Sequence, residues 1–334
     1  MPEQAAVPVI QVHPTRRCNL QCRHCYSSSG PRVSEQIEYG PLVECLTDSV
    51  EEGYRAVGFS GGEPLLYRPL RAALQAAQSL GLATTVTSNG MLLNDRGMAT
   101  LHGVTDLLAI SLDGVPASHN RMRGSPRAFE AMAANLHCVR EAGIPFGFIF
   151  TLTQHNVDEL LWVTRFAVEQ GAALLQIHPL EIVGRAATEL QDSEPDGLEL
   201  GVAFAEAVRL KLRLDGVLRV QIDISYQQLF RTAPGLFLSA GARSAPADTP
   251  LASLLPSVVL ETNGSLVPLV YGFAARYKVG NIHDERLAVS ARRWITDTYP
   301  AFHTLCHDVF AELADVGDAP FFNWYTEIGE RAAS

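Results

Sequence analysis

The sequence predicts an α/β fold: a partial (β/α)6 TIM-like barrel over residues 5–215, followed by a smaller α+β extension over residues 216–334. Six short apolar runs alternate with helical patterns at intervals of ~25–35 residues, which is typical of βα units and a parallel sheet. Six units are fewer than the eight that close a TIM barrel, so we expect an open sheet. Glycines, acids and amides follow several of the runs, at the strand ends where such folds place their chemistry.

Composition and length bound the class of protein. The chain has 334 residues, 47% hydrophobic and 19% charged, as expected of a globular protein with a sizeable core. Its net charge of −10 argues against nucleic acid as a partner. No apolar run reaches the ~18 residues of a membrane span, and the N-terminal residues lack a secretory signal pattern. Six cysteines, three of them clustered, suit a reducing compartment, so we expect a cytoplasmic protein with no membrane partner.

Hydrophobic spacing places the elements of the first part in order. A helix opened by Pro41 carries Leu42, Cys45 and Leu46 on one face, so Cys45 is predicted to be a buried core thiol. The strands are apolar runs that end in small or polar turn residues. On these patterns we expect strands at residues 7–12, 56–59, 83–87, 106–111, 146–152 and 174–178, and further helices at 69–80, 126–142 and 157–170.

The second part is less regular, and its clearest element is a hairpin. Asn263-Gly264 lies between two apolar runs and has the composition of a two-residue hairpin turn, which predicts strands on both sides of it within residues 258–267. The other elements that we expect are a helix at 198–214, a strand at 217–224, a loop at 236–256, a helix at 284–296 and an aromatic segment at 321–325 that docks on the body.

Cys18, Cys22 and Cys25 form the most informative motif, directly after the first strand. Closely spaced thiolates are soft ligands that select zinc, copper(I) or iron–sulfur clusters. Three ligands leave one iron of a four-iron cluster open for chemistry, so we favour an iron–sulfur site. A zinc knuckle that adds His24 or His13 as a fourth ligand is the alternative, and a disulfide framework fits the expected compartment less well.

Further motifs after this cluster make residues 8–185 resemble the radical S-adenosylmethionine (SAM) enzymes. The three cysteines fit that family's C-x3-C-x-Φ-C loop, which binds a 4Fe–4S cluster, with His24 in the usually aromatic position. The resemblance implies that the following residues bind SAM: Gly61, Gly62, Glu63 and Pro64 at its amino group, Ser88 and Asn89 after the third strand, Ser111 and Asp113 near the ribose, Arg123 at the carboxylate, and Phe150 beside the adenine.

The same resemblance implies a reaction and its cofactors. One electron from the reduced cluster would cleave SAM into methionine and a 5′-deoxyadenosyl radical, which would abstract a hydrogen from the substrate. The implied cofactors are therefore one 4Fe–4S cluster and SAM. An external electron donor such as a flavodoxin or ferredoxin would be needed to reduce the cluster.

The second part more faintly resembles the SPASM or twitch extension of such enzymes, which often modify ribosomally made peptides. That extension normally carries cysteines at positions where this chain has Leu269 and Ser239. Cys306 remains in this part, and one thiol cannot hold a second cluster. We therefore expect an extension that keeps its fold without auxiliary clusters, and a single-cluster enzyme. The missing clusters make redox-neutral outcomes such as epimerisation, rearrangement or radical addition easier to achieve, but the sequence does not decide between a redox-neutral and an oxidative reaction.

The substrate side is less well defined. His178 and Glu181, at the end of the sixth strand, are the candidate catalytic residues, and Gln176 and Arg185 should also face the barrel mouth. The alternative role for His178 is that of a structural histidine at the rim of the core. We expect a peptide or peptide-like substrate, and, because no leader-binding module precedes the first strand, a separate precursor-recognition protein. The alternatives are the same chemistry on a small metabolite (a sugar nucleotide, nucleoside or tetrapyrrole) and a non-catalytic cluster- or zinc-binding protein.

Overall fold

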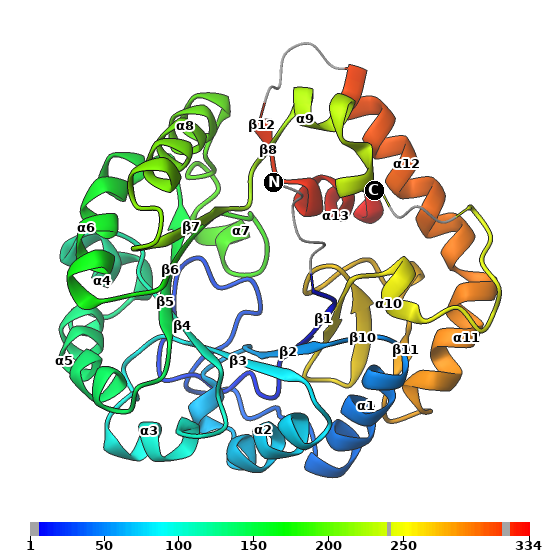
Figure 1. Ribbon diagram of the computed structural model, residues 1–334, viewed down its shortest axis with the longest axis horizontal. Coiled ribbons are helices and arrows are strands. Elements are labelled where there is room, and N and C mark those ends of the chain that lie inside the picture. Colours follow the sequence, from blue (N-terminus) through cyan, green and yellow to red (C-terminus); the bar gives the residue numbers. More distant parts are fainter. Residues whose placement is uncertain (1–6, 239–241, 316–320) are drawn as a thin grey trace.

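The computed structural model describes residues 7–238, 242–315 and 321–334, and it is built around one curved ten-stranded sheet (Figure 1). The strands of this sheet are β1 (Val9–Val12), β2 (Ala56–Phe59), β3 (Ala83–Ser88), β4 (Leu107–Ser111), β5 (Phe146–Leu152), β6 (Leu174–Pro179), β7 (Arg219–Ile222), β9 (Ser257–Leu260), β10 (Ser265–Pro268) and β11 (Gly280–Asn281). Their order is β11-β10-β9-β1-β2-β3-β4-β5-β6-β7, with β1 to β7 parallel. Within the described ranges the edge strands β7 and β11 do not pair, so the barrel is partial and open, as predicted.

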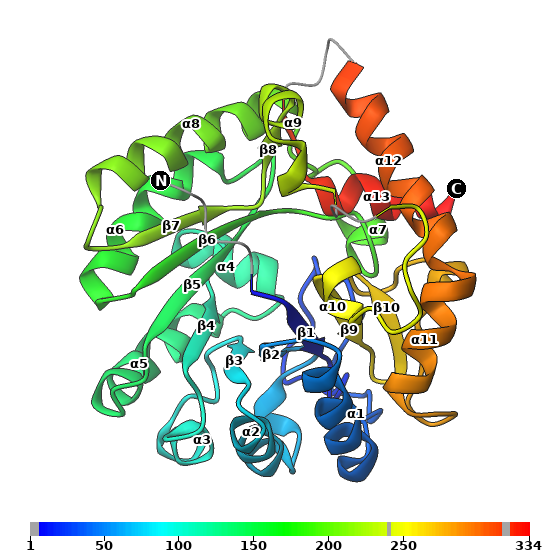
Figure 2. The same cartoon turned by 45° about the vertical axis from the view of Figure 1, so that its right-hand side comes forward.

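Helices cover the outer face of the sheet (Figures 1 and 2). A short pair of strands, β8 (Ser225–Tyr226) and β12 (Phe321–Phe322), stands apart from the main sheet. No helix in the described part of the chain combines the length and the apolar character that crossing a membrane requires. The helices are α1 (Tyr39–Glu51), α2 (Leu70–Ser79), α3 (Asp95–Leu101), α4 (Pro116–Arg123), α5 (Ala128–Glu141), α6 (Leu160–Gln170), α7 (Ala186–Glu189), α8 (Gly197–Arg213), α9 (Gln227–Thr232), α10 (Leu251–Leu254), α11 (Leu287–Asp297), α12 (Tyr299–Asp315) and α13 (Trp324–Ala333).

The predicted hairpin is present, and it extends the barrel sheet. β9 and β10 are antiparallel neighbours, but the register that pairs Leu260 with Leu266 makes the connection residues 261–264, longer than the predicted two-residue Asn263-Gly264 turn. Gly264 has φ +84°, and a Cβ there would lie 2.4 Å from the His283 ring, so the turn needs glycine. β9 also pairs with β1 in parallel register, which brings Val9 opposite Ser257. The C-terminal part therefore extends the sheet of β1 to β7, and it forms one wall of the cavity that this curved sheet encloses.

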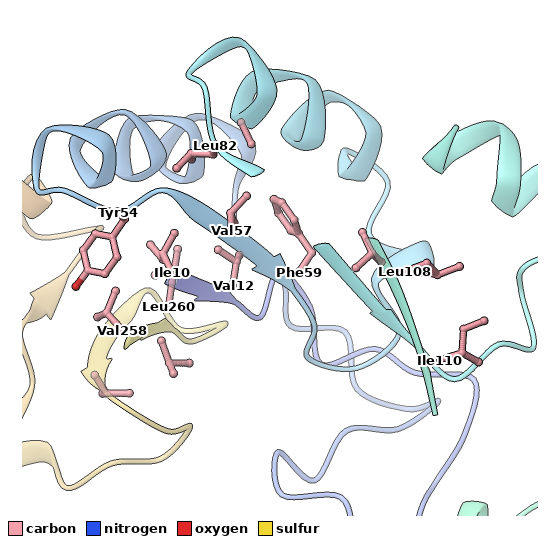
Figure 3. Close-up of a cluster of buried hydrophobic side chains, with 14 of the residues drawn as sticks. Ile10, Val12, Tyr54, Val57, Phe59, Leu82, Leu108, Ile110, Val258 and Leu260 are labelled. Carbon is pink, nitrogen blue, oxygen red and sulfur yellow. The ribbon is translucent and has the colours of Figure 1, made fainter. Parts of the chain in front are cut away.

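Strand alternation separates the core from the interior of the barrel. Ile10 and Val12 are fully buried in the core, and Val57 and Phe59 of β2 point toward the helix layer (Figure 3). Gln11, between the two buried residues of β1, faces the inner cavity instead. Each such buried side chain stabilises the fold by about 1.5–3 kcal/mol relative to an exposed one. The core thus fixes which side chains of every strand can reach a ligand.

Six helices were not predicted; three of them, α7, α9 and α10, are only four to six residues long, and α10 lies in the segment that was expected to be a loop. α4 is mostly polar and lacks the apolar stripe that marks a surface helix, although Pro116 at its start and Gly124 (φ +64°) at its end are typical boundary residues. α12 carries Pro300 in its first turn, where a missing N–H costs nothing, so proline did not end a helix there. α13 begins inside the aromatic segment that was expected to dock, and it packs against α12 (Figures 1 and 2). Cys45 is buried in the core, as predicted.

Candidate active site

The three clustered cysteines lie on the loop between β1 and α1, inside the curve of the sheet (Figure 1). Cys18 and Cys22 are each 8% exposed, and Cys25 is half-buried. All six cysteines of the chain are free thiols, which excludes the disulfide framework. Burial raises the pKa of the Cys18 thiol to about 12 and also raises that of Cys22, so binding a metal centre here must displace protons.

Each of the three sulfur atoms faces nitrogen donors of the protein. The Leu20 N–H lies 3.4 Å from Cys18 Sγ, and the Ser29 N–H lies 3.3 Å from Cys25 Sγ. Cys22 Sγ is 3.8 Å from Nη1 of Arg123. Such donors stabilise the negative charge that thiolate ligands acquire, and tune the metal centre they hold. The donor set therefore fits an iron–sulfur cluster.

These thiols open into a cavity of about 390 Å³, the size of a small-molecule site. It lies at the carboxyl ends of the parallel strands, where barrel folds place their chemistry. Most of the predicted site residues line it, from the cysteine loop to the end of β6: Cys18, Cys22, His24, Cys25, Gly61, Gly62, Ser88, Asn89, Ser111, Arg123, His178 and Glu181.

The turn after β2 packs directly on the backbone of the cysteine loop. The Gly62 N–H donates to the Thr15 carbonyl (2.8 Å), and the Glu63 N–H donates to the Arg17 carbonyl (2.9 Å). A Cβ on Gly62 would lie 2.3 Å from the Arg17 carbonyl oxygen, so a side chain at this position would push the two segments apart. Pro64 is buried at the start of the short turn that follows.

Glu63 is fully buried, and its carboxylate does not line the cavity. One oxygen accepts hydrogen bonds from Ser88 Oγ (3.0 Å) and the Leu65 N–H (3.3 Å), and the other accepts from the Asn89 N–H (3.0 Å). Burial raises the pKa of Glu63 to about 7, against the opposing effect of these hydrogen bonds. Glu63 therefore ties the end of β2 to the end of β3, which positions Ser88 and Asn89 toward the cavity.

Arg123, the last residue of α4, forms a buried ion pair with Asp113 at the end of β4. Arg123 Nη2 donates to Asp113 Oδ1 at 3.0 Å, and Nε lies 2.6 Å from Oδ2. Although burial opposes ionisation, Arg123 lowers the pKa of Asp113 to about 2. The backbone N–H of Asp113 donates to His119 Nδ1 (3.2 Å), so the neighbouring His119 is a neutral acceptor. Arg123 lines the cavity, whereas Asp113 lies behind it.

Phe150 does not lie where it was predicted. It is 0% exposed and belongs to the hydrophobic core, whereas Ile149 and Thr151 line the cavity. Successive side chains of a strand point to opposite faces, so the apolar pattern of β5 identified a buried strand without identifying its inner face. Ile149 is the apolar residue of this strand that a ligand can touch.

His178 lies between two carboxylates at the cavity mouth. Its Nδ1 is 3.1 Å from Asp223 Oδ2, and its Nε2 is 3.6 Å from Glu181 Oε1. Gln176 Nε2 also donates to Asp223 (2.7 Å). Burial disfavours the charged imidazolium, but the contacts with Asp223 and Glu181 outweigh it and raise the pKa of His178 to about 10. The sequence analysis missed Asp223 because it placed this residue inside a strand, whereas β7 ends just before it.

This arrangement predicts the charge of His178. In the Asp223→Asn variant we expect the pKa of His178 to fall by about 1 or more, because a carboxylate that favours the charged ring is lost. Nuclear magnetic resonance titration of the His178 ring signals measures this change, and the exposed Asp215→Asn serves as control. A His178 pKa at or below 6.5 in the unmodified protein would contradict the assignment.

The hairpin contributes the opposite wall of the cavity. Val259, Leu269 and Tyr271 line it, and Leu269 has a left-handed backbone conformation with φ +60°. The His13 ring stacks on Tyr271 with centroids 4.9 Å apart and also lies near Tyr26. Ser239, the other position predicted to have lost a cysteine, lies outside the described residues. Cys306, on α12, packs against the main core.

Arg185 was expected at the barrel mouth, but it braces the cysteine loop. Its guanidinium donates to the carbonyls of Cys22 and Ser29 (2.7 Å to Ser29), and its backbone N–H donates to the Cys25 carbonyl (3.0 Å). A Cβ on the preceding Gly184 would lie 2.1 Å from the Tyr26 carbonyl oxygen. The segment after β6 therefore holds the second and third cysteines of the motif, Cys22 and Cys25, in place.

Removing this brace should loosen the loop. We expect Arg185→Ala to retain less than about half of the iron of the unmodified protein after anaerobic reconstitution, because hydrogen bonds from a charged group contribute ~1.5–3 kcal/mol each. Iron analysis and visible absorbance measure the effect, with the exposed Arg165→Ala on α6 as control. Equal iron content in the two variants would contradict the bracing role.

Sequence comparison identifies a family match in the first part of the chain. Residues 12–167 match the family described as the Radical SAM superfamily. Among curated relatives, Fe-coproporphyrin III synthase of Methanosarcina barkeri is 31% identical over 183 residues, which are 53% of this chain and 45% of that protein. The sporulation killing factor maturation protein SkfB of Bacillus subtilis is 27% identical over 200 residues, 60% of this chain and 47% of that protein. The chain therefore spans about half the length of the curated relatives it matches.

Solved structures share the fold over nearly the whole chain. Streptococcus suis SuiB bound to S-adenosylmethionine has a TM-score of 0.68 at 16% identity, covering 89% of this chain and 68% of its own. The anSMEcpe enzyme with bound AdoMet and Kp18Cys peptide has a TM-score of 0.66 at 16% identity, covering 97% and 96%. The family that residues 12–167 match implies SAM and an iron–sulfur cluster, and the donor set of the cavity fits both. Residues 12–167 are therefore a Radical SAM domain.

Proposed function

We propose that the chain reductively cleaves SAM at a single 4Fe–4S cluster and uses the resulting radical to modify a peptide. The observation that carries this proposal is the opening of three thiols into one cavity at the carboxyl ends of the parallel strands. When bound, the cluster supplies one electron to SAM, and the sulfur–carbon bond breaks to give methionine and a 5′-deoxyadenosyl radical that takes a hydrogen atom from the substrate.

The roles of individual residues follow from their positions. Cys18, Cys22 and Cys25 would hold the cluster. His24 and the backbone of the Gly61-Gly62 turn line the cavity beside it, and Arg123 offers a cation toward a carboxylate. Ser88, Asn89 and Ser111 supply polar contacts from two further strand ends. Glu63 and Asp113 would act by positioning Asn89 and Arg123, since both carboxylates are engaged with protein groups.

The charges of the cavity favour a peptide over an anionic metabolite. Among the described lining residues, Arg123 is assigned to the carboxylate of SAM, and His178, the other strongly basic side chain, is already paired with Asp223 and Glu181. A tetrapyrrole with several propionates, or a sugar nucleotide, would bring further negative charge toward the carboxylates of Glu181 and Asp223, which would repel it. Burying such an anion also costs desolvation energy, which a free cation in the cavity would have to offset. A neutral or basic peptide side chain meets no such repulsion. SuiB has been crystallised with its precursor peptide SuiA, in keeping with a peptide substrate on this fold.

A tetrapyrrole remains the second candidate. Its support is the group of relatives named Fe-coproporphyrin III synthase, pre-heme d1 synthase and AdoMet-dependent heme synthase, which match about half of this chain. To separate the two, short open reading frames beside the gene are co-expressed with the chain, and the peptide products are weighed by mass spectrometry. A mass change that depends on Cys18 supports the peptide. Faster 5′-deoxyadenosine release on adding coproporphyrin III, with no peptide modified, would favour the tetrapyrrole.

We further propose that residues 216–334 form a SPASM- or twitch-like extension that holds no second cluster. Leu269 occupies a cavity-lining position expected to carry a cysteine, and Cys306 packs against the core. A site with one cluster lacks a built-in electron acceptor, which makes a redox-neutral reaction the expected outcome. The partners would be an external electron donor such as a flavodoxin or ferredoxin and a separate precursor-recognition protein.

The single-cluster proposal predicts the metal content. Anaerobically reconstituted protein should contain about four irons and four sulfides per chain. Iron and sulfide analysis measures this directly. The Leu269→Ala variant, reconstituted in the same way, is the control, because alanine adds no metal ligand at this position. About eight irons per chain would refute the single-cluster proposal.

A further inference from the structure

A second cavity, an open surface cleft of about 410 Å³, is lined by three arginines. Arg17, Arg32 and Arg68 are all exposed, and no acidic side chain is among the lining residues. Within the residues that the structure describes, no hydrogen bond or ion pair engages these three guanidinium groups. Leu66, Val33 and Pro31 add apolar surface between them. The cleft is therefore a basic patch without an internal partner.

This arginine cleft is built from the segments that hold the cysteine loop. Arg17 directly precedes Cys18, so their Cα atoms are about 3.8 Å apart. The Cys18 N–H donates to the Gly30 carbonyl (3.2 Å), and Arg32 follows Gly30 by two residues. Arg68 follows the turn after β2, whose Glu63 N–H donates to the Arg17 carbonyl (2.9 Å). The cleft thus adjoins the loop whose thiols face the inner cavity, and it shares no lining residue with that cavity.

The local charge opposes that of the whole chain. The chain carries a net charge of −10, and an acidic partner would be repelled by most of its surface. Arg16, the neighbour of Arg17, is already paired with Glu35 at 2.7 Å and adds no free charge. The three unpaired cations of this cleft therefore attract an acidic protein that docks there, although most of the surface would repel it.

We propose that the arginine cleft is the docking surface for an acidic one-electron carrier protein. The inference rests on the proposed function, in which the cluster must receive one electron from outside the chain before it can cleave SAM. In the transfer the carrier is oxidised by one electron and the cluster is reduced by one, and no bond forms or breaks. Docking at the cleft places the carrier over Arg17, one residue from a thiol ligand, and explains why basic side chains gather there without acidic partners.

The test compares two triple variants of the reconstituted protein that change the net charge equally. R17E/R32E/R68E reverses the cleft, and R96E/R165E/R213E reverses exposed arginines on α3, α6 and α8. Flavodoxin is the probe, and its Kd is measured by calorimetry at low and moderate salt. We expect the cleft variant to bind about 10-fold to 100-fold more weakly, the control to change by less than about 3-fold, and the unmodified protein to lose affinity as salt rises.

Activity gives the second readout. Formation of 5′-deoxyadenosine driven by reduced flavodoxin should fall in the cleft variant by about the same factor as binding, while formation driven by dithionite stays within about 2-fold. Equal flavodoxin affinity and equal flavodoxin-driven rates for the two triple variants would overturn the docking proposal. If dithionite yields no 5′-deoxyadenosine even with the unmodified protein, the proposed function fails, and the Kd comparison still decides whether the cleft binds the carrier.

Discussion

Replacing Cys18, Cys22 or Cys25 with alanine is expected to reduce 5′-deoxyadenosine formation by at least ~1,000-fold, equivalent to about 4 kcal/mol of barrier. The three thiols face one cavity and supply all of its soft ligands among the described lining residues. Two thiolates cannot hold a cluster that keeps one iron open, so each single variant should lose the cluster itself. Chromatographic assay of 5′-deoxyadenosine, with iron analysis of the same samples, measures the effect.

Cys45→Ala is the matched control for this experiment. Cys45 is buried in the core on α1 and lines no part of the cavity, so its replacement costs some packing but no ligand. It should keep iron content and 5′-deoxyadenosine formation within about 2-fold of the unmodified protein. Full activity in any of the three loop variants would show that the cluster is held elsewhere.

Arg123→Ala is expected to destabilise the protein by about 3–5 kcal/mol, because it leaves the buried Asp113 carboxylate without its partner. Arg123 holds the pKa of Asp113 at about 2, below the value of about 4 in an unfolded chain. The stabilisation by this pair is therefore present above about pH 4 and is lost as the pH falls through about 2. Urea unfolding of the metal-free protein, followed by circular dichroism, measures the free energy of unfolding.

The double variant Asp113→Asn with Arg123→Met separates pairing from packing. It removes both charges, so no isolated buried ion remains, and it should recover most of the stability lost in Arg123→Ala. SAM binding should stay weak in both variants, since the cation that faces the cavity is absent. A loss below about 1 kcal/mol in Arg123→Ala would mean that Asp113 is hydrated or protonated in the folded protein.

Much of the fold could be predicted because apolar runs and turn residues are local signals. The parallel strands and the Asn263-Gly264 hairpin follow from spacing within a few residues. The pairing of β9 with β1 could not be predicted in the same way, because it joins residues about 250 positions apart and no local pattern selects that partner. The polar helix α4 was missed because its ends are fixed by proline and glycine rather than by an apolar face.

The candidate site could also be predicted only in part, because local patterns do not determine where each side chain points. The cysteines and the Gly61-Gly62 turn could be placed in one cavity, because both follow parallel strands and the carboxyl ends of such strands meet at one edge of the sheet. Spacing could not show that Phe150 faces the core or that Arg185 turns toward the cysteine loop, since both depend on side-chain direction after folding. Asp223 was missed because the end of β7 was placed two residues too late.

The most direct test of the account is the fate of SAM on the reconstituted chain. With dithionite as reductant under anaerobic conditions, we expect SAM to be converted to 5′-deoxyadenosine and methionine in equal amounts, and the Cys18→Ala variant to form neither. Intact SAM after prolonged incubation with protein that carries about four irons per chain would contradict the account, because a loaded cluster would then be present without the chemistry that we propose for it.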